Sequence, residues 1–144
     1  MSLAGWVLVV EGNPILRQEW AAGLEERGGF AVRAAATLQD AECLIEAAEH
    51  NFDAIVLNER LANGSGNEFC ADLRAREDWT PVIIVASRAG EIDILRSFEA
   101  GADDHMTRPS IAELVARLRA QIRAASRPII PFAFAPAFAP ALVA

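Results

Sequence analysis

The sequence predicts an α/β fold with a doubly wound, five-stranded parallel sheet and five helices. Two observations carry this prediction. Five short apolar stretches of strand type alternate along the chain with stretches whose apolar residues recur at helical spacing. The strand-type stretches at residues 6–10 and 81–86 are apolar without interruption, as in strands that helices cover on both faces. Alternation of this kind implies right-handed crossovers between parallel strands.

The first half of the chain contains three of the predicted strands and two of the helices. Asn13 followed by Pro14 predicts the start of a helix, and Gly28-Gly29 predicts its end. Thr37 predicts the cap of a second helix. The strands expected here are residues 6–10, 30–35 and 54–57, and the helices are residues 14–27 and 38–48.

The second half contains the other two strands and three helices. Asn63-Gly64 predicts a loop over residues 59–66. Ser110, with Glu113 three residues later, forms a capping box that predicts the start of the last helix. The strands expected here are residues 81–86 and 105–106, and the helices are centred on residues 69–73, 92–98 and 111–122.

Composition restricts the function classes that remain. The chain has 144 residues and a formal net charge of −7, which argues against a general nucleic-acid-binding surface. All 13 basic residues are arginine, so chemistry that needs a lysine amine is excluded. We see no targeting signal and no span of the ~20 apolar residues that a membrane helix needs, and we expect a cytoplasmic protein. Cys43 and Cys70 are expected to be buried, reduced thiols.

A break in composition divides the chain into residues 1–127 and residues 128–144. All charged residues lie before residue 128, whereas the final segment, PIIPFAFAPAFAPALVA, has none. Two interpretations of this tail stay open. It is either the start of a linker or an apolar arm that docks on a groove of this chain or of a neighbouring chain.

Six stretches carry a family resemblance. They are residues 7–14 (VLVVEGNP), 53–58 (DAIVLN), 80–85 (TPVIIV), 101–104 (GADD), 107–109 (TRP) and 113–119 (ELVARLR). Over residues 5–125 the chain resembles a receiver domain of bacterial two-component response regulators, and the last three stretches most resemble the winged-helix transcription-factor subfamily. The resemblance implies a flavodoxin-like sheet with strand order 2-1-3-4-5.

The resemblance also implies a phosphoacceptor pocket, which in this chain is degenerate. Family members carry the phosphoryl group on an aspartate after strand three, and here that position is Asn58. The acidic pair that helps to hold Mg²⁺ is Glu11 and Gly12, the hydroxyl position is Ala86, and the lysine position is Arg108. An amide cannot form an acyl phosphate, and one carboxylate beside a guanidinium offers Mg²⁺ little. We therefore expect no catalytic residue, metal or cofactor. Between Glu11 and Arg108 we expect an ion pair, with two solvated side chains as the alternative.

The resemblance places two further features in the second half of the chain. The aromatic switch position is His105, interpreted either as a pH sensor or as an exposed polar substitute on an edge strand. Helix four, strand five and helix five form a dimer face in the subfamily. Its residues here are Ile94, Asp103, Asp104, Glu113, Arg117 and Arg119.

That face predicts a weak homodimer in which Asp104 and Arg117 pair across a two-fold axis. Ile94 would lie in its apolar part, with Leu95 and Leu118 as neighbours. The alternative is a solvated face on which Asp104 and Arg117 pair within one chain.

The features together favour an atypical receiver that signals by phosphorylation-independent contact with a protein partner or with its own effector domain, as the regulatory part of a transcriptional regulator. A stand-alone adaptor or a module of a sensor protein is the main alternative, and a weakly active phosphoacceptor is a third. We expect neither enzymatic activity nor contact of this domain with nucleic acid or membrane.

Overall fold

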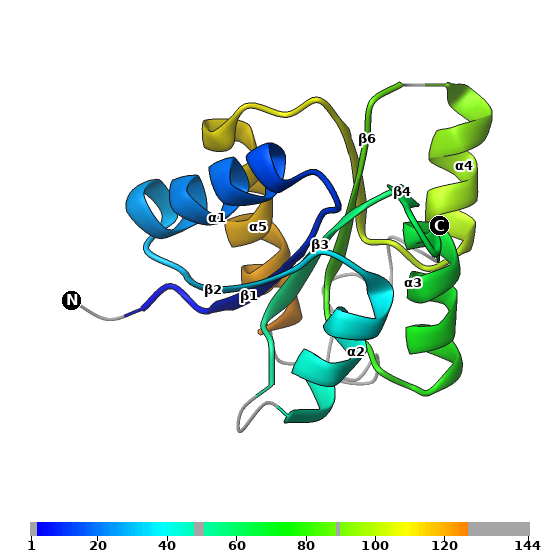
Figure 1. Cartoon of the computed structure of the whole chain (residues 1–144), viewed down its shortest axis with the longest axis horizontal. Coiled ribbons are helices and arrows are strands. Elements are labelled where there is room, and N and C mark those ends of the chain that lie inside the picture. Colours follow the sequence, from blue (N-terminus) through cyan, green and yellow to red (C-terminus); the bar gives the residue numbers. More distant parts are fainter. Residues whose placement is uncertain (1–2, 48–50, 89, 127–144) are drawn as a thin grey trace, which may run out of the picture.

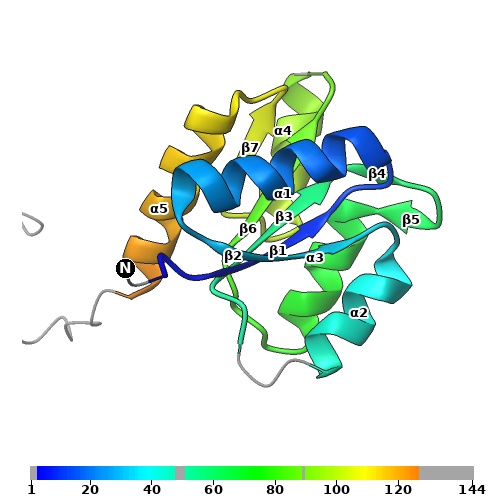
Figure 2. The same cartoon turned by 60° about the vertical axis from the view of Figure 1, so that its left-hand side comes forward.

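The computed structural model describes residues 3–47, 51–88 and 90–126. It confirms the doubly wound α/β fold, with five parallel strands in one sheet in the order β2-β1-β3-β6-β7 (Figures 1 and 2). This order is the predicted 2-1-3-4-5. The sheet strands are β1 (Trp6–Val10), β2 (Ala31–Ala35), β3 (Ala54–Asn58), β6 (Val82–Ala86) and β7 (Asp104–Thr107). The helices are α1 (Pro14–Gly28), α2 (Leu38–Ala47), α3 (Gly66–Ala75), α4 (Glu91–Glu99) and α5 (Ile111–Ala125).

Helices cover both faces of the sheet, as Figures 1 and 2 show. Trp20 and Leu24 of α1 pack with Leu114 and Leu118 of α5 on one face. Residues of α2 and α3 pack on the other face, among them Leu73. The central strands β1, β3 and β6 are buried on both sides, which explains their continuous apolar sequence.

Capping side chains fix the helix starts at the predicted places. Asn13 Oδ1 accepts hydrogen bonds from the backbone N–H groups of Ile15 and Leu16 at the start of α1. Gly29 ends the same helix in the left-handed region, at φ 71°. Ser110 Oγ accepts the Glu113 N–H at the start of α5. Asn13 and Ser110 satisfy backbone donors that have no partner inside the helix, whereas the Gly29 N–H donates to carbonyl oxygens of the last turn of α1.

The segment 59–66, which the sequence predicts as a loop, instead contains a small antiparallel hairpin. Its strands are β4 (Arg60–Leu61) and β5 (Gly64–Ser65). Strands of two residues are too short to produce an alternating pattern, so periodicity cannot detect them. The hairpin returns the chain to β3, and a Cβ at Gly66 would lie 2.5 Å from the Asn58 carbonyl oxygen. Glycine is therefore required where α3 begins.

Two further expectations have different outcomes. Both cysteines are free thiols, but only Cys70 is buried, and the prediction that Cys43 is buried is wrong because it lies on the exposed side of α2. The expectations for residues 128–144 lie outside the described residues. No helix in the described part of the chain has the length and apolar content that crossing a membrane requires.

Candidate functional site

The carboxyl ends of the sheet strands bring the predicted pocket residues to one edge. Glu11 follows β1, Asn58 ends β3, Ala86 ends β6 and Arg108 follows β7. The parallel pairing of β3 and β6 places Asn58 beside Val85, so these two strands end at nearly the same height along the sheet. The backbone N–H of Arg108 donates to the carbonyl of Ala86 at 3.1 Å, so the last two positions are neighbours. Clustering of these positions is thus as the sequence predicts.

The centre of the site is a side-chain hydrogen bond between Asn58 and Glu11. The Asn58 Nδ2 donates to Glu11 Oε2, and the Glu11 side chain is buried, with the residue 3 % exposed. The other Glu11 oxygen, Oε1, accepts the Asn13 N–H at 3.2 Å. Asn58 Oδ1 accepts the Arg60 N–H at 2.8 Å. A flipped amide would place oxygen against the carboxylate and NH₂ against an N–H, so the network fixes the orientation of the amide.

Arg108 lies at this edge but does not pair with Glu11, so the predicted Glu11–Arg108 ion pair is wrong. The residues that the structure describes contain three ion pairs, and neither Glu11 nor Arg108 belongs to one. Arg108 is exposed and has a left-handed backbone, at φ 44°. The Glu11 carboxylate instead accepts hydrogen bonds from the Asn58 side-chain amide and the Asn13 backbone N–H. The buried carboxylate is thus hydrogen-bonded without an arginine beside it.

Arg17 is a basic residue of this edge that the sequence analysis missed. Its Nη1 donates to the carbonyl oxygens of Glu11, at 2.9 Å, and Gly12, at 3.3 Å. These bonds tie the loop after β1 to the first turns of α1. The position of Arg17 one turn after the Asn13 cap could have indicated such a contact.

The site does not fit a magnesium ion. Within the described ranges, no three His, Cys, Asp or Glu residues gather closely enough to hold a metal. Glu11 is the one carboxylate of the predicted pocket set, and its two oxygens already accept hydrogen bonds. Asp53 lies at the opposite end of β3, where its Oδ2 accepts the Trp6 N–H at 2.8 Å. Mg²⁺ prefers an octahedral set of oxygen ligands, and this donor set lacks them.

A cavity of about 420 Å³ opens between α1, the end of β6 and the turn into α5. Asn58, Ala86 and Arg108 line it together with Glu19, Ser87, Ser110 and several apolar side chains. These apolar side chains are Leu16, Trp20, Val85, Pro109 and Ile111. Ala86 contributes a methyl group where a hydroxyl would be needed to contact a phosphoryl oxygen. The cavity thus keeps the location of a phosphoacceptor pocket but has an apolar wall.

His105 occupies an edge strand, β7, as one of the two interpretations from the sequence requires, but the exposure which that interpretation expects is wrong. The residue is half-buried, and its Nε2 is a buried atom with no hydrogen-bond partner. An imidazole nitrogen in this state is costly, because it has lost water without gaining a protein partner.

The face formed by α4, β7 and α5 differs from the expectation in two contacts. Arg117 Nη1 lies 3.1 Å from Asp104 Oδ2 within the same chain, so this ion pair forms without a second copy of the protein. Leu118 is fully buried in the core and contributes nothing to the surface. Ile94 is half-buried. Asp103 also has a partner in its own chain, because Arg74 Nη2 lies 2.9 Å from its Oδ2.

The two remaining residues of this face are exposed. Glu113 lies in the first turn of α5. Arg119 donates a hydrogen bond of 3.4 Å to the Gly28 carbonyl at the end of α1.

The apolar stripe that predicts α4 faces outward. Ile92, Leu95 and Phe98 are 65 %, 53 % and 46 % exposed, whereas Ser97 on the other side of the helix is fully buried. Helical spacing therefore identifies the helix correctly, but three of its large apolar residues lie on the exposed side, and the one fully buried residue of α4 is a serine. An exposed apolar stripe on a helix of a small domain indicates a contact surface.

Comparison with known proteins agrees with this architecture. The response regulator receiver domain family matches residues 7–119. The KDP operon transcriptional regulatory protein KdpE of Escherichia coli (strain K12) is 40 % identical over 128 residues, which cover 87 % of this chain and 54 % of that protein. The transcriptional regulatory protein TcrA of Mycobacterium tuberculosis is 36 % identical over 119 residues, covering 81 % of this chain and 46 % of that protein. The chain spans about half the length of these curated relatives.

Solved structures give the same result. The receiver domain of the Francisella response regulator 1452 superposes with a TM-score of 0.78 at 26 % identity, covering 85 % of this chain and 99 % of that domain. The Thermotoga maritima response regulator DrrB superposes with a TM-score of 0.72 at 25 % identity, covering 92 % of this chain and 58 % of DrrB. On the family match, the sequence relatives and the strand order together, this chain belongs to the response regulator receiver domain family.

Proposed function

We propose that this receiver domain signals through protein contacts without accepting a phosphoryl group at residue 58. The observation that carries the proposal is the hydrogen bond from the Asn58 amide to the buried Glu11 carboxylate. A carboxamide oxygen is a poor nucleophile toward phosphorus, and its nitrogen here is already committed as a donor. The bond also gives the Glu11 carboxylate a donor from within the protein. The carboxylate would therefore not require a metal ion as its positive partner.

The domain would act as the regulatory part of a transcriptional regulator, with an effector domain or a separate protein as its partner. The names of the relatives KdpE and TcrA support this role, as both are transcriptional regulatory proteins. Such a role places the protein in the cytoplasm with the genome, and it requires no enzymatic activity of the domain itself.

The contact surface we propose is α4, used in a weak homodimer. Its support is the exposed apolar stripe of Ile92, Leu95 and Phe98. Asp104 and Arg117 already pair within one chain, so exchanging that pair across an axis would break one ion pair for each one formed. Apolar contact, rather than ion pairs, would therefore supply the association energy.

Sedimentation over a range of concentrations tests this surface. Leu95→Glu should reduce self-association, while Ile15→Glu, which changes an even more exposed apolar residue on α1, should leave it unchanged. A protein that stays monomeric at millimolar concentration would contradict the homodimer.

Mass spectrometry after incubation with acetyl phosphate and Mg²⁺ tests the absence of phosphorylation. We expect no adduct of about 80 Da on the parent chain. Asn58→Asp alone should label poorly, because Gly12 still leaves the metal short of a carboxylate. The double variant Gly12→Asp/Asn58→Asp should label faster, and a Cβ at residue 12 has space, 3.7 Å from the Ala36 carbonyl oxygen. A phosphate adduct on an aspartate of the parent chain would contradict the proposal.

A further inference from the structure

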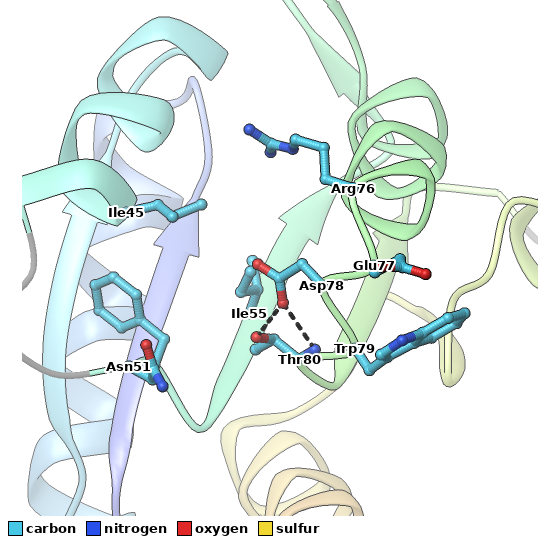
Figure 3. Close-up of a pocket in the computed structure, with 9 residues that line it drawn as sticks. Ile45, Asn51, Ile55, Arg76, Glu77, Asp78, Trp79 and Thr80 are labelled. Atoms are coloured by element: carbon cyan, nitrogen blue, oxygen red, sulfur yellow. Dashed lines mark hydrogen bonds between the residues drawn. The ribbon is translucent and has the colours of Figure 1, made fainter.

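Trp79 is an exposed tryptophan at the amino edge of the sheet, opposite the candidate site. It lies in the loop between α3 and β6 and is 70 % exposed. The loop that carries it is held in place: Asp78 Oδ1 accepts hydrogen bonds from the N–H of Thr80 at 3.0 Å and from its hydroxyl at 2.6 Å. Figure 3 shows both bonds and shows the Trp79 ring pointing away from Ile45 and Asn51. The indole is thus presented to solvent from a fixed loop.

A groove with a volume of about 360 Å³ lies against this ring. Trp79, Pro81, Gly101, Ala124 and Ala125 form its apolar part. Arg74, Asp103 and Gln121 complete the lining. The apolar part of the groove is suited to an apolar occupant with little charge.

The main charged residue of the groove, Arg74, has its hydrogen bonds met by the protein. Its guanidinium donates to the carbonyl oxygens of Gly101, Asp78 and Thr80 and pairs with Asp103. It also lies 5.7 Å from the centre of the Trp79 ring. Arg74 therefore forms part of the groove wall, and its guanidinium does not need an anionic ligand to satisfy its hydrogen bonds.

The polypeptide leaves the folded domain at the rim of this groove. Ala124 and Ala125, which line it, are the last two residues of α5. The sequence that follows, residues 128–144, has no charged residue and contains Phe132, Phe134 and Phe138 among prolines and alanines. An extended proline-rich chain advances about 3.1 Å per residue, so the first phenylalanines are within reach of Trp79.

We propose that residues 128–138 of the same chain dock in the groove beside Trp79. Proline-rich segments bind aromatic-lined grooves because their extended conformation is largely formed before binding. The tether favours the chain's own segment over that of a second copy, since a short connection gives an effective concentration in the millimolar range. The docked segment would cover the indole and shield the apolar phenylalanines from water. This inference is independent of the proposed function.

Tryptophan fluorescence of the full chain tests the proposal. We expect the parent chain to show a blue-shifted emission and weaker acrylamide quenching than the variant Phe132→Ser/Phe134→Ser/Phe138→Ser, which keeps the length of the tail. The same comparison in a Trp79→Phe background should show no difference, because Trp6 and Trp20 lie outside the groove. Ile15→Ser, a change to an exposed apolar residue of α1 that lies outside both the groove and the α4 stripe, serves as the matched control and should leave emission unchanged.

Three results would overturn the proposal. Equal emission and quenching in the parent and the triple variant would show that the tail does not cover Trp79. A difference that persists with Trp79→Phe would assign the effect to another site. A difference that disappears on dilution would mean that the tail of a second copy, not the chain's own, occupies the groove.

Discussion

Replacing Asn58 by aspartate probes the central hydrogen bond of the candidate site directly. The substitution keeps the acceptor that receives the Arg60 N–H and removes the donor that faces Glu11. The new carboxyl group then lies against the carboxylate of Glu11, a residue that is 3 % exposed, and Glu11 loses the amide donor that it has in the parent chain. We expect the variant to be less stable than the parent at neutral pH.

The size of the loss follows from the chemistry of the pair. A hydrogen bond to a charged group contributes about 1.5–3 kcal/mol. Two charges ~4 Å apart at an effective dielectric constant of ~20 repel by roughly 4 kcal/mol. Protonation limits the total, because holding an aspartic acid neutral at pH 7 costs about 1.4 kcal/mol for each of about three pH units. We expect the free energy of unfolding to fall by about 2–4 kcal/mol at pH 7 to 8. Because Asn58 is only half-buried, the decrease should lie toward the lower end of this range.

The pH dependence has a defined sign. The introduced carboxyl has a pKa in the folded variant above its value in the unfolded chain, so the folded state binds more protons between the two values. The destabilisation should therefore be small near pH 4 and grow as the pH rises toward 7. Urea denaturation of the parent and Asn58→Asp at several pH values measures this difference.

The double variant Glu11→Gln/Asn58→Asp provides the control, because it reverses donor and acceptor and restores one hydrogen bond between a carboxylate and an amide. It should recover most of the lost stability and remove the pH dependence. If Asn58→Asp alone is as stable as the parent at pH 8, the Glu11–Asn58 bond does not hold the site together.

Three further predictions test other parts of the structure. His105→Phe should raise the free energy of unfolding by about 1 kcal/mol, because it removes the buried Nε2 that has no partner; a decrease in urea midpoint would contradict this. Arg74→Lys should lower it by about 2–3 kcal/mol, since an ammonium cannot reproduce the guanidinium contacts with three carbonyls and Asp103, and an unchanged midpoint would show that those contacts contribute little. Ellman's reagent should label Cys43 quickly in the folded protein and Cys70 only on unfolding, because burial raises the pKa of the Cys70 thiol; rapid labelling of both would contradict its burial.

The fold could be predicted from the sequence because its strongest signals are local. The apolar run of β1, the Asn13-Pro14 start of α1 and the Ser110 cap of α5 each fix an element, and the alternation of elements fixes the fold class. The hairpin of β4 and β5 escaped prediction because two residues cannot show a period. The direction of the α4 stripe escaped for another reason: helical spacing reveals that two sides differ, and it does not reveal which side a neighbour covers.

The residues of the site could also be predicted, but not all of their contacts. Strand ends of a parallel sheet meet at one edge, so Glu11, Asn58, Ala86 and Arg108 were expected together. Which donor reaches the Glu11 carboxylate depends on backbone angles and side-chain directions that a sequence pattern does not specify. Arg108, with its left-handed backbone, lies at the edge without pairing, while the Asn58 amide is already beside the carboxylate.

The identity of residue 58 explains how the rest of the site can remain folded. Gly12 and Ala86 remove a carboxylate and a hydroxyl from the predicted pocket, and both changes leave small uncharged residues. Glu11 remains as a buried charge that must be hydrogen-bonded. An alanine at residue 58 would leave Glu11 Oε2 without the donor that it has in this structure, and an aspartate would repel it. Asparagine supplies that donor and still accepts the Arg60 N–H, so one amide satisfies both Glu11 Oε2 and the Arg60 N–H.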